Sequence, residues 1–563
     1  MKKIAVLFLI LCLGSCRTTN EKIVKPEGFV AKNAMVVSAR EEASKIGVEI
    51  MQKGGNAFDA MVATELALLV SYPFAGNLGG GGFMVYRKTN GETGALDYRE
   101  KAPLAATKNM YLDSLGNVIP GKSLYGATSV GVPGTVAGIF ECHKKFGSLP
   151  IEDLISPVIA LARKGVVVTE NQEKRLTEYR KLIAEISGDS SYFARDFKAG
   201  DTLKYPKLAA TLTRIMKNGR DEFYKGETAK ILAGFVQQKG GYITLEDLEN
   251  YQAVWRTPVE FHYKNIKVIS MSPPSSGGIT LAQIMKMLEP YNIGQYRHNS
   301  VKAIQLITEA ERRAYADRNY FLGDPDFVAI PTDSLLDENY LKKRMNDFSF
   351  DKASLSSDIK EGNINFAESM ETTHYSIIDA MGNAVAVTTT LNGAYGSKLY
   401  VDELGFFLNN EMDDFSAKPG VPNMFGLIGA EANSIAPGKR MLSSMTPTIV
   451  EKEGKLWMVV GTPGGSTIIT SVLQTILNVY EFEMNIQQAV NAPRFHHQWL
   501  PDAITFEPQG FPQELIDSLS TFGYKVNKNR TPILGKVDAI LVWPDGTLEG
   551  GADRRGDDSA KGY

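Results

Sequence analysis

Two threonines occupy mirror-image positions in a predicted β-hairpin. Residues 373–379 and 384–390 are rich in β-branched and aromatic residues, which favours two strands. Between them, Ala380-Met381-Gly382 is typical of a tight turn with glycine at positive φ. If the hairpin is symmetric about Met381, Thr372 lies opposite Thr390, and opposed Cβ atoms about 4.5–5.5 Å apart bring the two hydroxyl groups within reach of each other. On this pattern alone, a structural threonine pair is the simpler interpretation.

A glycine-rich turn, Gly-Thr-Pro-Gly-Gly at 461–465, is the second chemical feature. It joins a predicted strand at 456–460 to a helix that starts near Ser466. A turn of this kind exposes backbone N–H groups at a helix N-terminus, where negative charge is stabilised. The bound charge can be a phosphate, a carboxylate or a transient oxyanion. The turn therefore predicts an anion site without identifying the anion.

Other candidate sites are excluded by their context. Four glycines at 79–82 allow close backbone approach, but a strand follows them and no Gly-Lys-Ser/Thr does, so a phosphate loop is rejected. His496 and His497 are adjacent, so their side chains point in different directions and a zinc site is disfavoured. Cys142 is the one cysteine beyond residue 16, so neither an internal disulfide nor a thiol metal cluster is expected.

The surrounding pattern predicts the elements that position these residues. Helices are expected at 39–53 and, with Asn56 as cap, up to about Ser71; strands are expected at 83–86 and 95–99. Residues 135–345 are predicted to be mainly helical, and 346–371 to be an exposed linker of the kind that tolerates cleavage. The long loop at 412–445 carries enough aromatic and apolar residues to argue against disorder.

Composition places the chain among globular proteins of more than one lobe. It has 563 residues, of which 43% are hydrophobic and 22% charged. The formal net charge of −3 gives no basic face for nucleic acid or anionic lipid. No run of 18 apolar residues follows the N-terminal region, so no membrane-spanning segment is expected in the body of the chain.

The N-terminus predicts an export signal at residues 1–16. Lys2 and Lys3 precede an apolar stretch at 4–13 that is too short to cross a bilayer. The stretch ends in Leu-Gly-Ser-Cys at 13–16, which resembles the bacterial lipobox, in which the cysteine (here Cys16) receives the lipid. An ordinary secretory signal is the alternative. In both cases we expect an exported protein, periplasmic or anchored to a membrane, and removal of the two lysines changes the net charge from −3 to about −5.

From about residue 30 to Tyr563 the chain resembles the bacterial γ-glutamyltransferases. Seven motifs occur in the same order and at matching spacing, and although each is weak singly, seven in register are specific. The motifs are Leu-Asp-Tyr-Arg-Glu at 96–100, Pro-Pro-Ser-Ser-Gly-Gly at 273–278, Thr-Thr-His-Tyr-Ser at 372–376, Leu-Asn-Asn-Glu-Met-Asp-Asp-Phe at 408–415, Leu-Ser-Ser-Met-Thr-Pro at 442–447, Gly-Thr-Pro-Gly-Gly-Ser at 461–466 and Asn-Ala-Pro-Arg-Phe-His-His at 491–497.

This resemblance implies a fold and a maturation step. The fold is the α+β sandwich of the N-terminal-nucleophile hydrolases, an αββα arrangement of two stacked antiparallel sheets between helix layers, with an additional helical region in the large subunit. The precursor would cleave itself between Glu371 and Thr372. The large subunit would be residues 17–371 and the small subunit residues 372–563, and the two would remain one folded unit because they share the sheets.

The resemblance also implies catalytic roles. Thr372 would be the nucleophile; a threonine hydroxyl is weak without a base, and cleavage frees an α-amine on the same residue whose pKa near 8 suits proton transfer. Thr390 resembles the family's second threonine, which orients the first. The N–H groups of Gly464 and Gly465 would stabilise the tetrahedral oxyanion. The implied reaction transfers the γ-glutamyl group from glutathione or another γ-glutamyl amide to water or to an amino acid or dipeptide amine, with no metal or organic cofactor.

Substrate-binding residues follow from the same motifs. Arg99 resembles the arginine that binds the substrate α-carboxylate, for which its planar fork is better suited than lysine. A charged residue taken alone is more often a solvated charge or a surface ion pair, and the motif context reverses that preference. Ser443 and Ser444 would complete the carboxylate pocket, and the ligands of the α-ammonium would be Asn392, Glu411 and Asp414.

One residue departs from the family pattern. Bacterial relatives with a long loop after the Asp-Asp motif place a tyrosine in it, whose hydroxyl reaches the asparagine that matches Asn392 and closes the site. Here the corresponding residue is Phe425. The ring can still cover the pocket, but one hydrogen bond is missing, so we expect a leakier lid and more hydrolysis relative to transfer.

Two alternatives remain. A cephalosporin-type acylase on the same scaffold would act on glutaryl side chains, which lack the α-ammonium and therefore do not need Asn392, Glu411 and Asp414. A non-catalytic lipoprotein that binds γ-glutamyl peptides would not need Thr372. Gel electrophoresis distinguishes them, because a live N-terminal nucleophile gives two bands and an unprocessed chain gives one.

The lipobox interpretation is tested by replacing its cysteine. We expect Cys16→Ala to leave the membrane fraction or to stop leader removal, because the residue that would carry the lipid is gone. Fractionation followed by immunoblotting measures this. If the variant stays with the membrane as the parent does, the lipobox interpretation is wrong.

Overall fold

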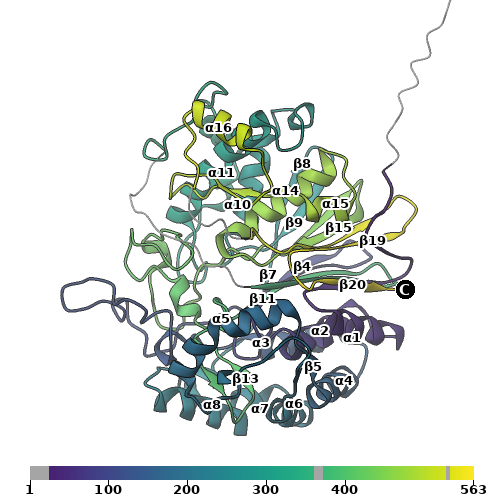
Figure 1. Cartoon of the computed structure of the whole chain (residues 1–563), viewed down its shortest axis with the longest axis vertical. Coiled ribbons are helices and arrows are strands. Elements are labelled where there is room, and N and C mark those ends of the chain that lie inside the picture. Colours follow the sequence, from purple (N-terminus) through teal and green to yellow (C-terminus); the bar gives the residue numbers. More distant parts are fainter. Residues whose placement is uncertain (1–23, 360–371, 528–532) are drawn as a thin grey trace, which may run out of the picture.

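Two seven-stranded antiparallel sheets lie face to face between two layers of helices (Figure 1). The computed structural model describes residues 24–359, 372–527 and 533–563. Cys16, the export signal and Glu371 therefore lie outside the described residues. The arrangement confirms the predicted αββα sandwich.

The first sheet contains the predicted hairpin at its centre. Its strands, in spatial order, are β20 (Ser559–Gly562), β2 (Met35–Ser38), β10 (Thr373–Ile378), β11 (Ala384–Thr390), β3 (Gly81–Arg87), β4 (Thr93–Asp97) and β7 (Val254–Arg256). The second sheet runs β1 (Phe29–Ala31), β19 (Leu548–Ala552), β18 (Asp538–Val542), β15 (Lys455–Gly461), β14 (Thr448–Lys452), β9 (Ile266–Ser270) and β8 (Val259–Tyr263). Each sheet thus combines strands from before residue 360 with strands from after residue 371.

Helices cover the outer face of each sheet (Figure 1). On the side of the first sheet, α1 (Glu41–Gln52), α2 (Ala57–Ser71) and α3 (Thr135–Phe146) contact its strands. The other helices on that side are α4 (Ile151–Lys164), α5 (Glu170–Ser187), α6 (Pro206–Asn218), α7 (Arg220–Tyr224), α8 (Glu227–Gln238) and α9 (Leu245–Glu249). On the side of the second sheet lie α10 (Gly277–Leu288), α11 (Val301–Phe321), α12 (Thr332–Leu335), α13 (Glu338–Arg344), α14 (Ile468–Tyr480), α15 (Ile486–Asn491) and α16 (Gln513–Thr521).

Three two-stranded pairs contain the remaining strands of the described residues: β5 (Val166–Val167) with β6 (Thr202–Leu203), β12 (Tyr400–Val401) with β13 (Phe406–Phe407), and β16 (Phe495–His496) with β17 (Thr505–Phe506). The first two helices match their predicted positions. Asn56 caps α2 as expected, since its side chain accepts from the N–H groups of Phe58 and Asp59.

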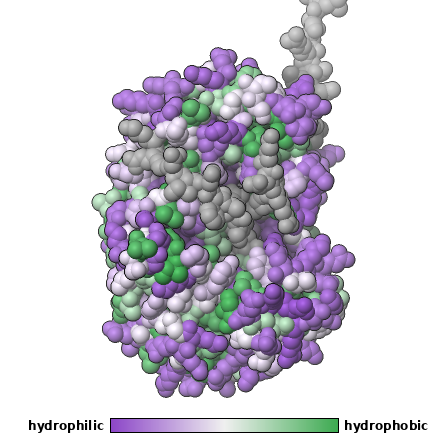
Figure 2. Space-filling view, turned by 60° about the vertical axis from the view of Figure 1, so that its left-hand side comes forward, coloured by the Kyte–Doolittle hydropathy of each residue, from purple (hydrophilic) through white to green (hydrophobic). Residues whose placement is uncertain are grey.

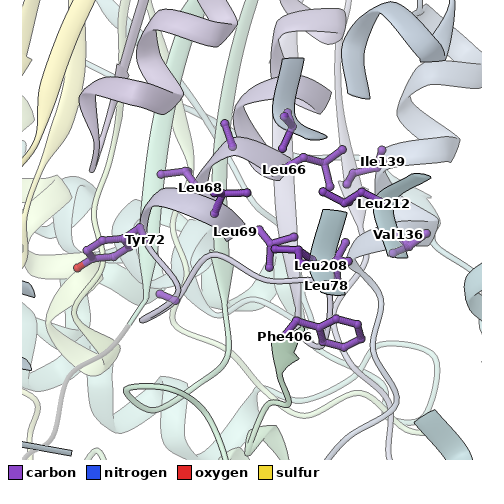
Figure 3. Close-up of a cluster of buried hydrophobic side chains, with 14 of the residues drawn as sticks. Leu66, Leu68, Leu69, Tyr72, Leu78, Val136, Ile139, Leu208, Leu212 and Phe406 are labelled. Atoms are coloured by element: carbon purple, nitrogen blue, oxygen red, sulfur yellow. The ribbon is translucent and has the colours of Figure 1, made fainter. Parts of the chain in front are cut away.

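Two hydrophobic cores result from the alternation of side chains along the strands. Val36, Met84 and Tyr375 belong to the core between the first sheet and its helices. Figure 3 shows the helical part of that core, where Leu208 and Leu212 of α6 meet side chains of α2 and α3. Met35 and Phe83, one residue away on the same strands, belong to the second core, which includes the space between the sheets.

The hairpin interrupts the apolar space between the sheets with a row of polar side chains. His374 and Ser376 of β10 point towards the second sheet: His374 Nδ1 lies 2.9 Å from Thr388 Oγ1, and Ser376 Oγ donates to the carbonyl of Asp538 (3.0 Å). Gly461 of β15 allows this contact, because a Cβ there would lie 2.3 Å from the imidazole of His374. By the same alternation, Thr372 lies on this inner face.

The observed register confirms the predicted hairpin. Pairs run from Ile378 opposite Ala384 to Thr373 opposite Thr389, so the next position sets Thr372 opposite Thr390. Gly382 has φ 85°, the positive value predicted for the turn. The carboxylate of Asp379 fixes the turn further, since it accepts from the backbone N–H groups of Met381 and Asn383, each at 2.9 Å.

One expectation was incomplete and one was wrong in part. The region 135–345 is mainly helical, as predicted, but it also supplies β7, an edge strand of the first sheet, and β9 and β8, the last two strands of the second sheet. Residues 346–371 were expected to be an exposed linker, but its described part is partly docked. Ser356 is buried, and its carbonyl accepts from Trp499 Nε1 (3.0 Å).

The surface is mostly hydrophilic on the face drawn in Figure 2, with small and scattered hydrophobic patches. The most exposed large apolar side chains, Leu115 at 84% and Met381 at 59%, occupy loops or turns. In the parts of the chain that the structure describes, no helix has both the length and the apolar composition needed to span a bilayer.

Candidate active site

One pocket collects most of the predicted site residues. It is lined by Arg99, Thr372, Thr390, Asn392, Asp414, Phe425, Ser443, Ser444 and Gly465, together with Arg318, Leu427, Leu442, Met445 and Ile468. Glu411 and Gly464 were also predicted, and they lie directly behind this lining as the partner of Arg99 and the neighbour of Gly465. The structure therefore brings these predicted residues together in one place.

The two threonines are buried at the end of the hairpin. Thr372 is 4% exposed and Thr390 2% exposed. The backbone N–H of Asn392 donates to Thr390 Oγ1 at 2.7 Å, which fixes the orientation of that hydroxyl. Asn392 itself has φ 69°, a left-handed conformation that asparagine tolerates better than most residues. Its side-chain amide donates to the carbonyl of Asn410 (3.1 Å), which ties this corner to the loop that carries Glu411.

The glycine-rich turn lies beside Thr372. Gly464 has φ 139° and Gly465 φ 53°, both in the region that favours glycine, and a short 3₁₀ turn, Gly465–Thr467, leads into α14. The first N–H groups of a helix have no intrahelical acceptor, so they are available to an anion. The turn that was predicted to hold an oxyanion borders the pocket at Gly465.

Arg99 lies in a network of buried carboxylates. Its two terminal nitrogens form ion pairs with Glu411 Oε1 and Asp414 Oδ2, and its side chain is 1% exposed. Burial lowers the pKa of Arg99, but the charges of Glu411 and Asp414 more than reverse this effect, so the guanidinium stays protonated. The backbone is held as well, because the Tyr251 hydroxyl donates to the Arg99 carbonyl at 2.7 Å.

This network differs from the sequence expectation in one respect. Arg99 was assigned to the substrate carboxylate, and Glu411 and Asp414 to the substrate ammonium, as separate groups. The structure joins all three side chains through ion pairs. A zwitterionic amino acid fits such a network, since its carboxylate can pair with the arginine and its ammonium with the acidic side chains.

Sequence reasoning missed Arg318. This residue of α11 lines the pocket, and its guanidinium donates to the hydroxyls of Ser276 and Ser444, each at 3.0 Å. Burial lowers its pKa to about 10. No signal in the sequence marks it, because the burial of the charged residues of α11, among them Glu311 and Asp317, is seen only in the structure.

Ser443 and Ser444 are held in place by the 273–278 motif. Ser443 N–H donates to the carbonyl of Pro274 (2.9 Å), and the Ser276 hydroxyl donates to the carbonyl of Ser443 (2.7 Å). A motif far away in sequence therefore has a supporting role for the two serines.

Phe425 lies over the glycine turn. A Cβ at Gly465 would come within 2.4 Å of its ring. Asn423 ties the loop to the binding network, because its amide donates to Asp414 Oδ1 (3.1 Å) and its Oδ1 accepts from the Phe425 N–H (3.0 Å). From the other side, Gln498 Nε2 donates to the Phe425 carbonyl at 3.2 Å. The loop at 412–445 is thus ordered and reaches the site, as expected.

The described residues contain no group of three or more His, Cys, Asp and Glu side chains arranged to hold a metal ion. His496 and His497, which the sequence analysis considered, are buried and engaged with other partners, namely Thr470 and Gln498 for His496 and Asp502 for His497.

Comparison with known proteins agrees with this geometry. The glutathione hydrolase proenzyme of Escherichia coli (strain K12) is 47% identical over 538 residues, which cover 95% of this chain and 92% of that protein. The Acylase ACY 1 proenzyme of Pseudomonas sp. (strain V22) is 34% identical over 533 residues, 93% of this chain and 92% of that protein. A cephalosporin acylase from Bacillus halodurans superposes with a TM-score of 0.84 over 97% of this chain and 98% of its own, at 24% identity, and so shares the fold.

The family model described as gamma-glutamyltranspeptidase matches residues 43–563, which include every predicted site residue of the pocket. On this match and the identity to the glutathione hydrolase proenzyme, the chain belongs to the γ-glutamyltranspeptidase family.

Proposed function

We propose that the chain is the precursor of a γ-glutamyltransferase with glutathione hydrolase activity, which cleaves itself between Glu371 and Thr372 and then uses Thr372 as its nucleophile. One observation carries the proposal. The hairpin register sets Thr372 opposite Thr390, in the same pocket as the glycine turn and Arg99. The family match and the glutathione hydrolase relative support the same reaction.

In the first half of the reaction, the α-amine of Thr372 accepts the proton of its own hydroxyl, and Oγ1 attacks the γ-carbonyl of the donor. Thr390 Oγ1, fixed by the Asn392 N–H, orients the attacking hydroxyl. Donors at Gly464 and Gly465 receive the negative charge of the tetrahedral intermediate. The amine then returns the proton to the leaving nitrogen, and a γ-glutamyl ester remains on Thr372.

In the second half, water or an acceptor amine attacks the ester carbonyl and gives its proton to the same α-amine. The bond between the acyl carbon and Thr372 Oγ1 then breaks, and the α-amine returns the proton to Oγ1. Water gives glutamate and hydrolysis, whereas an amino acid or dipeptide gives transfer. Both halves are acyl transfers, so only protons move besides the acyl group and no electrons are gained or lost.

Charge selects the donor. Glu411 and Asp414 are buried carboxylates beside Arg99, and a ligand ammonium compensates their charge better than any neutral group. The 34% identical acylase is the reason to consider a glutaryl donor as well. A glutaryl group has no ammonium, so an acylase would make no use of these carboxylates. The buried carboxylates therefore favour a γ-glutamyl donor.

For location, we propose export through the leader at 1–16 and attachment by lipid at Cys16. This rests on the sequence of that segment.

Maturation is tested with Thr372→Ala. We expect this variant to remain one uncut chain, because the hydroxyl that attacks the Glu371 carbonyl is missing, and intact-mass analysis measures it. Thr372→Ser should still be cut. Thr373→Ala is the matched control, since Thr373 is the buried neighbour and its hydroxyl has no described hydrogen-bond partner. Normal cleavage of Thr372→Ala would remove Thr372 from the mechanism.

Arg99→Lys tests donor recognition. Lysine cannot form two parallel bonds, and charged hydrogen bonds contribute roughly 1.5–3 kcal/mol, so we expect KM for a γ-glutamyl donor to rise roughly 10- to 100-fold. Processing into two subunits should continue. Arg87→Lys is the control, because Arg87 forms a comparable buried ion pair with Glu451 away from the pocket. An unchanged KM in Arg99→Lys would mean that the α-carboxylate binds elsewhere.

Phe425→Tyr tests the lid. A restored hydrogen bond, worth roughly 0.5–1.5 kcal/mol, should lower the ratio of hydrolysis to transfer by about two- to tenfold. The ratio is measured with a γ-glutamyl anilide in the presence and absence of glycylglycine. Phe425→Leu controls for loss of the ring, which packs on Gly465. A ratio that is unchanged or higher in Phe425→Tyr would show that a hydroxyl at this position does not control water access.

A further inference from the structure

Glu100 is a buried carboxylate that the catalytic steps above leave unused. It follows Arg99 in the sequence, its side chain is fully buried, and it is not part of the pocket lining. Neither of its carboxylate oxygens has a hydrogen-bond donor among the described residues. Backbone encloses it, since a Cβ at Gly81 would lie 2.6 Å from Glu100 Oε2 and one at Gly131 would lie 3.2 Å from Glu100 Cβ. An ionised carboxylate in this position lacks the partners that such a charge requires.

The same guanidinium nitrogen serves Glu100 and Glu411. Arg99 Nη1 pairs with Glu411 Oε1 and lies 3.8 Å from Glu100 Oε2. Glu411 Oε2, like the Glu100 oxygens, is buried without a described donor. Two carboxylates held this close in a buried site do not both ionise easily, and the usual solution is one shared proton.

The other charged and titratable groups around Glu100 are consistent with one proton shared between Glu100 and Glu411. Asp414 adds a further negative charge, and Arg318, which acts on Asp414, adds the second positive one. The remaining neighbours are the phenols of Tyr98, Tyr224 and Tyr251, whose pKa values burial raises, so they stay neutral. Fully ionised, the cluster would contain three carboxylates and two guanidinium groups, with a net negative charge inside the protein.

We propose that Glu100 and Glu411 share one proton, and that Glu100 is thereby a positioning residue that keeps the donor pocket neutral towards a zwitterionic headgroup. This proposal rests on the proposed function of the site. With the shared proton, two carboxylate charges balance Arg99 and Arg318. A γ-glutamyl donor, whose α-carboxylate and α-ammonium cancel, then enters without a net change of charge. A glutaryl headgroup brings an unbalanced negative charge and is disfavoured.

The direction in which pH changes the donor KM follows from the raised pKa of Glu100. Burial raises the pKa of Glu100 to about 7, although the positive charge of Arg99 lowers it. The proton is therefore held below about pH 7 and lost above it. Once the proton is lost, the second carboxylate charge competes with the substrate for Arg99, so donor KM should rise with pH. The α-amine of Thr372 titrates separately and acts on kcat.

Glu100→Gln is the central test. The glutamine amide keeps the shape of a protonated Glu100 and permanently donates to Glu411. Measured between pH 6 and 9 with a γ-glutamyl anilide, the parent should show a donor KM that rises above the pKa of the pair, by up to tenfold per pH unit. Glu100→Gln should match the parent KM at pH 6 and show no rise, while its kcat profile stays that of the parent. Parallel KM profiles in the two proteins would overturn the proposal.

Two further variants keep the test decisive. Glu411→Gln removes the other member of the pair, so its KM profile should also become flat, and it carries the test if Glu100→Gln fails to fold. Glu65→Gln is the matched control, because Glu65 is a buried glutamate with a pKa raised by burial to about 7 that pairs with Tyr375 outside the pocket. Its KM profile should follow the parent, and a flat profile there would contradict a specific role for Glu100. Absence of γ-glutamyl release by the parent would instead refute the proposed function.

Discussion

The structure depends on the register of one hairpin. A strand has two faces, and a shift by one residue would turn Thr372 and Thr390 away from the pocket and into the apolar core of the helical layer. That register is fixed from three sides: by the apolar side chains that face the helices, by the turn that Asp379 closes, and by the contact of His374 with Gly461. The glycine is needed because the two sheets approach closely at that point.

The second organising constraint is charge in a buried environment. Arg99 forms ion pairs with Glu411 and Asp414 before any substrate arrives, so the geometry of these three side chains is preorganised. Burying these three charged side chains costs more free energy than leaving each of them solvated by water. The cluster therefore contributes little to the stability of the fold, and its value lies in the selection of the substrate. Arg318 donates to the hydroxyl of Ser444, and its charge acts on Asp414, so it connects helix α11 to the pocket.

Features with a local physical signature were predictable from the sequence. The capped helix at Asn56, the hairpin with its glycine turn, and the strand-to-helix turn at Gly464 each follow from the residues that form them. Most of the pocket came from the family motifs and not from periodicity. What remained hidden depends on long-range packing. The strand β8 alternates but β9 does not, and both are only five residues long and lie within a helical region. Arg318 lies on a helix whose buried side is recognised only once its neighbours are known, and the docking of Ser356 depends on Trp499, far along the chain.

The interleaving of the strands has a consequence for the two chains that the proposed cleavage would produce. In the first sheet, β10 and β11 of the later segment lie between β2 and β3 of the earlier one, and in the second sheet β1 and β9 of the earlier segment flank four strands of the later one. Separation of the chains would break hydrogen-bonded ladders in both sheets and expose both cores. Each copy would therefore keep its original partner for its whole lifetime. In a mixture of two variants, subunit exchange would be negligible, and a defect in one chain could not be complemented by a sound chain from another molecule.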